Sequence, residues 1–72
     1  MESNNVKYLV GGRIRSAREL AGMTQKELAK SPGVNSSSQQ IGKYELGHQD
    51  MTIAKLYRIA AALKVEPRSL LP

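Results

Sequence analysis

This 72-residue chain has no cysteine, no tryptophan and no phenylalanine, and it has a single histidine. Without cysteine it can form neither a disulfide nor a thiolate metal site, so packing alone must hold the fold. One histidine, His48, is too few for a cluster of ligands or a catalytic triad. Gly11 and Gly12 are a bare pair outside any phosphate-binding motif. These absences argue against an enzyme, and we expect no cofactor.

Long hydrophobic runs are absent as well. No apolar stretch approaches the roughly 20 residues of a membrane-spanning helix, and no signal-peptide pattern opens the chain. The length fits one domain, and 40% of the residues are hydrophobic, which is enough for one small core. We therefore expect a soluble cytoplasmic protein.

Positive charge is in excess and unevenly distributed. The chain carries 11 Lys and Arg against 6 Asp and Glu, a formal net charge of +5. Within 7–43 the basic residues are Lys7, Arg13, Arg15, Arg18, Lys26, Lys30 and Lys43, and the acidic ones are Glu19 and Glu27. This balance suits an acidic polymer such as nucleic acid, although a solvated basic surface explains the charge equally well.

Apolar periodicity and capping residues predict an all-α fold of five short helices. A flexible N-terminal arm is expected over residues 1–7, followed by a single folded domain over 8–72. The helices are expected near 8–21, 25–30, 37–45, 53–63 and 67–71. The apolar positions expected to face the core are Val10, Ile14, Ala17, Ala21, Leu28, Ala29, Val34, Ile41, Tyr44, Ile53, Leu56, Ile59, Ala60 and Leu63. Leu70 and Leu71 can either close this core or lie exposed at a dimer interface.

Helix boundaries carry the clearest local signals. Gly22 is a C-cap candidate for the first helix, and the run from Thr24 to Glu27 is a capping box for the second. The third helix has two possible caps, Ser36 with Gln39 or Ser37 with Gln40, and the sequence does not choose between them. Thr52 can cap the fourth helix.

The second and third helices are short and are joined by a turn that contains Gly33, which is a helix-turn-helix pattern. If the third helix buries Ile41 and Tyr44, its polar and small residues face elsewhere or lie near its start. These residues are Ser38, Gln39, Gln40, Gly42 and Lys43. Gln can bond an adenine edge through two hydrogen bonds, and Lys can donate to guanine. Gly42 would let the helix approach DNA or a neighbouring helix closely.

The chain from about Gly12 to Leu71 resembles the Xre/Cro-type helix-turn-helix repressors, which have a lambda-repressor-like fold. The matching residues are Gly12-Arg13-Ile14-Arg15, Arg18, Gly22 to Ala29, Gly33-Val34, Gln39-Gln40-Ile41, Lys43-Tyr44-Glu45, Gly47 and the run Ile53 to Leu63. The match is strong because these residues occur together, whereas each alone would be a weak signal.

The resemblance implies roles for several residues. Gln25 matches a residue that touches a phosphate, and Ser38, Gln39 and Lys43 match positions that meet base edges. Glu45 matches a glutamate that pairs with an arginine of the first helix, here Arg18. Residues 46–49 match a loop that contacts the DNA backbone.

The turn between the second and third helices departs from the family pattern. Members usually place fewer residues between the Leu-Ala of the second helix and the Ile of the third, so this chain carries about two extra residues within Ser31 to Ser38. Either the turn bulges or the third helix starts earlier.

The predicted function is a sequence-specific regulator of transcription, encoded by a bacterium or phage, that binds double-stranded DNA. It is expected to be a repressor and a homodimer, with no membrane or small-molecule partner. The alternative is a protein-interaction module on the same fold, such as the antitoxin of a toxin–antitoxin pair. That alternative calls for a tail that wraps around a partner, and the sequence ends at Pro72 without one.

Overall fold

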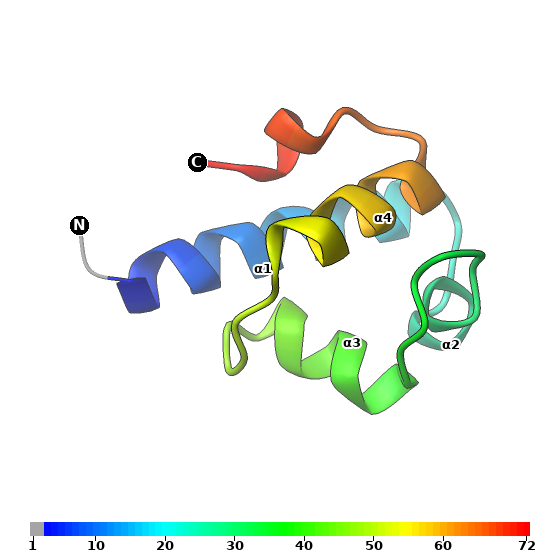
Figure 1. The fold of residues 1–72 in the computed structure, drawn as a ribbon, viewed down its shortest axis with the longest axis horizontal. Coiled ribbons are helices and arrows are strands. Elements are labelled where there is room, and N and C mark those ends of the chain that lie inside the picture. The colour runs from blue at the N-terminus through cyan, green and yellow to red at the C-terminus, as the bar shows by residue number, and fades with distance from the viewer. Residues whose placement is uncertain (1–2) are drawn as a thin grey trace.

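A computed structural model of the protein describes residues 3–72. It consists of α1 (Ser3–Leu20), α2 (Gln25–Ala29), α3 (Ser38–Glu45), α4 (Ile53–Leu63) and a final 3₁₀ turn, η1 (Pro67–Leu70). No strand occurs among the described residues, so the all-α prediction is confirmed. The long α1 runs along the molecule, with α3 on one side of it, α4 and η1 on another, and α2 at its C-terminal end (Figure 1).

The prediction of five helices is wrong, because the last element is a single 3₁₀ turn. Its hydrogen bonds join residues three apart, from the Ser69 amide to the Glu66 carbonyl at 2.9 Å and from the Leu71 amide to the Arg68 carbonyl at 3.2 Å. Four residues that begin with Pro67, which has no amide hydrogen, are too few to establish an α-helical ladder.

The first helix is longer than predicted. It begins at Ser3, so residues 3–7 are helical, where the sequence analysis expected a loose arm. Met1 and Glu2 lie outside the described residues. The chain contains no glycine or proline before Gly11. Val6 lies one turn before the buried Val10, and the two valines line one apolar cavity. The apolar repeat of α1 therefore begins at Val6, before the predicted helix start at Tyr8. The polar run from Ser3 to Asn5 conceals this earlier start in the sequence.

The predicted helix boundaries are confirmed at several positions. Thr24 and Glu27 form both hydrogen bonds of the capping box, and the Thr52 hydroxyl accepts from the Lys55 amide at 3.0 Å. Gly22, with φ of 71°, ends α1 in a Schellman motif, because the Met23 amide donates to the Arg18 carbonyl. For α3 the structure selects Ser37 as the cap, whose hydroxyl accepts from the Gln40 amide.

One hydrophobic core receives side chains from every element. It comprises Val10, Ile14, Leu28, Ala29, Val34, Ile41, Tyr44, Leu56, Ile59, Ala60, Leu63 and Leu70. Of the other predicted positions, Ala17 is partly buried against this core, and two lie outside it. Ala21 follows the end of α1 and is exposed, and Ile53, the first residue of α4, is 70% exposed. Leu70 closes the core, whereas Leu71 is exposed.

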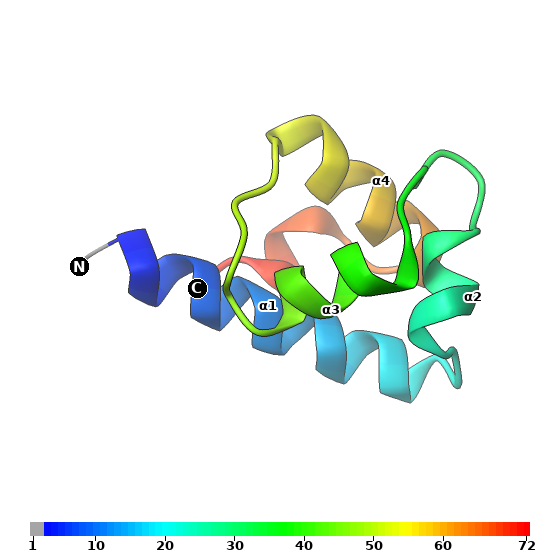
Figure 2. The same cartoon turned by 90° about the horizontal axis from the view of Figure 1, so that it is seen from below.

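Two glycines allow α1 to pass very close to α3. A Cβ atom on Gly11 would lie 2.7 Å from the Glu45 carbonyl oxygen and closer still to that of Tyr44. Gly47, just after α3, has a φ of 74° and approaches the backbone of Tyr8. The second view shows α3 lying along α1 at this crossing (Figure 2). This contact fixes the distance between α3 and the rest of the molecule.

None of the helices within residues 3–72 has both the length and the apolar content needed to cross a bilayer.

Candidate nucleic-acid interface

Helix α3 lies at the edge of the molecule, supported by α1 and α2 (Figures 1 and 2). Its inner side carries Ile41 and Tyr44, which are buried, and Glu45, whose side chain is 3% exposed. Burial in the core raises the pKa of Tyr44 above its ordinary value, because it disfavours the charged phenolate. The inner side therefore fixes the helix and leaves its outer side open to solvent.

The outer side of α3 carries polar groups that remain unused within the protein. Gln39 and Lys43 are exposed, and Ser38 and Gln40 are partly exposed. Among the hydrogen bonds and ion pairs of residues 3–72, none involves the side chain of any of these four residues. Their donors and acceptors are therefore free to bind another molecule.

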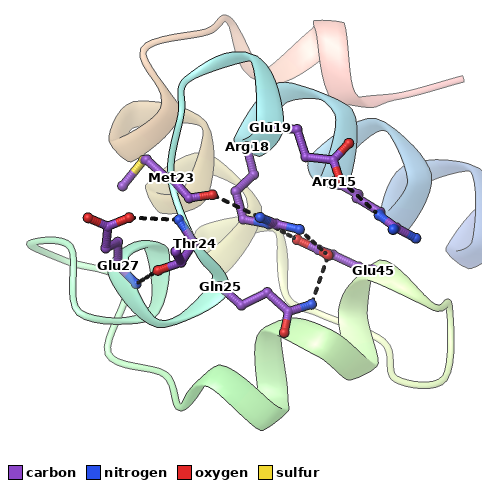
Figure 3. Close-up of polar contacts among 8 residues, drawn as sticks. All are labelled: Arg15, Arg18, Glu19, Met23, Thr24, Gln25, Glu27 and Glu45. Carbon is purple, nitrogen blue, oxygen red and sulfur yellow. Dashed lines mark hydrogen bonds and ion pairs between the residues drawn. The ribbon is translucent and has the colours of Figure 1, made fainter.

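A polar network beneath α3 connects it to α1 and α2 (Figure 3). Arg18 Nε donates to Glu45 Oε2 at 2.6 Å and Arg18 Nη2 donates to Oε1 at 3.2 Å, so the predicted pair is brought together with two hydrogen bonds. Arg18 Nη1 also donates to the Met23 carbonyl at 2.8 Å. The hydrogen bond to Glu45 is the main cause that raises the pKa of Arg18 further above its ordinary value. The pair joins α1, the following turn and α3.

Gln25 completes this network from the start of α2. Its Nε2 donates to Glu45 Oε1 at 3.0 Å, and its amide lies over Gly42 of α3. A Cβ on Gly42 would sit 3.6 Å from Gln25 Nε2, which is an ordinary contact. Since the amide nitrogen carries two hydrogens, one remains for a second acceptor. Gln25 therefore has a structural role that the sequence did not indicate, alongside a free donor.

The turn between α2 and α3 is the segment for which the resemblance predicts about two extra residues. It covers 30–37, and α3 does not start early, because Ser37 is its cap and Ser38 its first residue. Val34 anchors it in the core with no exposed surface.

Gln49 belongs to the loop 46–49, for which the resemblance implies a contact with the DNA backbone, and the structure places it beside the outer side of α3. It follows α3 in the loop, and its side chain lines a shallow polar hollow with Ser37, Gln39, Gln40 and Lys43. No spacing rule connects Gln49 with these residues, because the chain turns at Gly47 between them. The candidate interface therefore extends from α3 into the loop that follows it.

The sequence profile described as helix-turn-helix matches residues 14–70. The chain belongs to this helix-turn-helix family, of the Xre/Cro type. An uncharacterized HTH-type transcriptional regulator of Sinorhizobium fredii is 44% identical over 64 residues, which are 89% of this chain and 43% of the relative. An uncharacterized transcriptional regulator in the ATPase CF(0) region of Rhodospirillum rubrum is 45% identical over 62 residues, 86% of this chain and 56% of the relative. The chain thus spans about half the length of these curated relatives.

Solved helix-turn-helix structures have the same fold. The restriction-modification controller protein C.AhdI of Aeromonas hydrophila superposes with a TM-score of 0.89 at 25% identity, over 99% of this chain and all of that one. The P22 c2 repressor, solved with a synthetic operator, superposes with a TM-score of 0.78 at 30% identity, over 88% of this chain and 92% of the repressor.

Proposed function

We propose that the protein binds double-stranded DNA sequence-specifically and regulates transcription as a repressor, reading the major groove with α3. The observation that carries this proposal is the outer side of α3, where Ser38, Gln39, Gln40 and Lys43 make no side-chain bonds within residues 3–72. A helix of this kind fits the major groove, and amides and ammonium groups match base edges. The names of the relatives and the operator complex of the P22 c2 repressor support it.

Phosphate contacts would hold the protein in register. Gln25, at the first position of α2, has a free amide hydrogen, and Gly42 leaves room beside it for close approach to the DNA backbone. Lys43 and the net charge of +5 supply the electrostatic attraction. We propose a homodimer on half-sites about 34 Å apart, acting without a cofactor in the cytoplasm of a bacterium or in a phage-infected cell. No observation favours the antitoxin alternative.

Affinity for duplex DNA should fall steeply as salt rises. If the basic surface displaces counterions from phosphates, log K is linear in log salt, with a slope near −0.9 for each phosphate contacted. Fluorescence anisotropy of a labelled duplex, titrated with protein at several salt concentrations, measures this slope. An affinity that stays constant with salt would exclude the proposed function.

Replacing Gln39 and Gln25 by alanine should have different consequences. Gln39→Ala removes an amide that bonds one base, so preference at one base pair should fall by roughly 1–3 kcal/mol. Gln25→Ala removes a phosphate donor and should weaken all sequences about equally. Sites are selected from a random duplex pool with each variant and with the wild type.

The pattern of selected bases decides between the two roles. A Gln39→Ala motif identical to that of the wild type at every position would show that Gln39 reads no base. Gln40 or Lys43 would then be the next residue to replace. A Gln25→Ala motif altered at one position would contradict its assignment to a phosphate.

A further inference from the structure

Lys55 of α4 reaches across to the turn that precedes α3. Its Nζ donates to the Val34 carbonyl, to Ser36 Oγ at 3.0 Å and to the Asn35 carbonyl at 3.3 Å. The side chain is partly buried over this turn. An ammonium group has three hydrogens, so three successive residues of the turn account for all of its donors.

Besides the anchor of Val34 in the core, this turn is restrained by few hydrogen bonds. It contains two left-handed residues, Gly33 with φ of 84° and Asn35 with φ of 51°. Apart from the bonds to Lys55, the hydrogen bonds of residues 33–36 run from the Val34 amide to the Ser31 carbonyl at 3.1 Å, from the Ser36 amide to the Ala29 carbonyl at 3.4 Å and from Ser36 Oγ to the Val34 carbonyl at 3.2 Å. Asn adopts the left-handed conformation more readily than most residues. That conformation alone does not determine the direction of the backbone after Asn35. The ammonium group of Lys55 adds hydrogen bonds to three oxygens of this turn and thereby holds them together.

The position of the turn determines where α3 begins. Ser36 precedes Ser37, the cap of α3, so a shift at Ser36 displaces the first turn of the helix. Gln39 and Gln40 lie in that first turn, whereas Glu45 and its partners hold only the far end. Base contacts depend on placement within about 0.5 Å, so a small displacement is enough to weaken them.

We propose that Lys55 is a positioning residue for sequence recognition: by binding the oxygens of residues 34–36, it fixes the start of α3 and hence the placement of Gln39 and Gln40. The role rests on the proposed function. Lys55 itself does not touch DNA, because its three donors are directed into the protein. It therefore governs discrimination between sequences without contributing to phosphate binding.

The test compares Lys55→Met with Lys64→Met, which removes an exposed lysine just after α4. Affinities are measured for the duplex selected by the wild type and for single-base variants of it, each over a salt series. In Lys55→Met, the ratio of affinities for the selected duplex and its single-base variants should fall roughly fivefold to tenfold at the base pairs read by Gln39 or Gln40. This change corresponds to about one hydrogen bond. The slope against salt should not change, whereas loss of a phosphate contact would reduce it by about one. Lys64→Met should keep the wild-type values.

Two further measurements make the test independent of any folding defect. Ser36→Ala keeps Lys55 and removes one of its three acceptors, together with the hydrogen bond that Ser36 Oγ donates to the Val34 carbonyl. It should reduce discrimination at the same base pairs by a smaller factor, because two acceptors of Lys55 remain. In the free protein, ¹⁵N relaxation should show lower order parameters at Asn35 and Ser36 in Lys55→Met. Unchanged discrimination in both variants, or a reduced salt slope in Lys55→Met, would overturn the positioning role. A wild type that selects no sequence would instead overturn the proposed function, and this inference with it.

Discussion

Gly11→Ala is expected to destabilise the protein by ~3 kcal/mol or more, at the upper end for overpacking of a well-packed site. The added Cβ would meet the carbonyl oxygens of Tyr44 and Glu45, with the latter at 2.7 Å. Both obstacles are backbone atoms of α3, so no side-chain rotation relieves the clash and the two helices must separate. Thermal unfolding followed by circular dichroism should show a melting temperature lower by more than about 10 °C.

Gly12→Ala is the matched control, because the same change one residue further along α1 meets no atom within 4 Å. Alanine is the better helix former, so this variant should be more stable than the wild type by up to ~1 kcal/mol. The two substitutions therefore have opposite expected signs. Equal stability of Gly11→Ala and Gly12→Ala would show that α1 and α3 are not in the close contact described above.

Glu45→Ala should cost ~3 kcal/mol, because it leaves the guanidinium of Arg18 without its charge partner in a nearly buried site. The side chains of Arg18 and Glu45 are 11% and 3% exposed, and Glu45 also accepts from Gln25. The double variant Arg18→Ala/Glu45→Ala should lose less free energy of unfolding than the sum of the two single variants, because neither charge is left without its partner. Urea denaturation of all four proteins of this cycle measures the coupling.

The surface pair of Arg15 and Glu19 provides the control for this cycle. These residues also belong to α1, but their side chains are more than half exposed and 3.4 Å apart. Glu19→Ala should cost less than ~1 kcal/mol. Additive effects of Arg18→Ala and Glu45→Ala would mean that the pair beneath α3 is no more coupled than this exposed one.

Local sequence determined the boundaries of the helices and most of the core. A capping box acts between residues three apart, so Thr24 with Glu27 is recognisable without knowledge of the fold. The same holds for Gly22, Thr52 and the buried repeat of α4 from Leu56 to Leu63. The resemblance to the Xre/Cro-type family rests on matching residues between Gly12 and Leu71, so it was also recognisable without reference to the structure. The extent of α1 was not determined in this way, because its polar start conceals the apolar repeat.

Tertiary structure alone decided which of several equivalent residues matters. Gly11 and Gly12 are adjacent glycines that the sequence does not distinguish, yet only Gly11 lies where α1 contacts α3. Lys55 is one of several lysines, and only the packing of α4 beside the turn that precedes α3 places its ammonium group among three oxygens. The choice of Ser37 over Ser36 as the cap depends on the same turn. Periodicity and capping act over a few residues, whereas close approach and bridging depend on elements that are distant in sequence and are therefore set only when the helices pack.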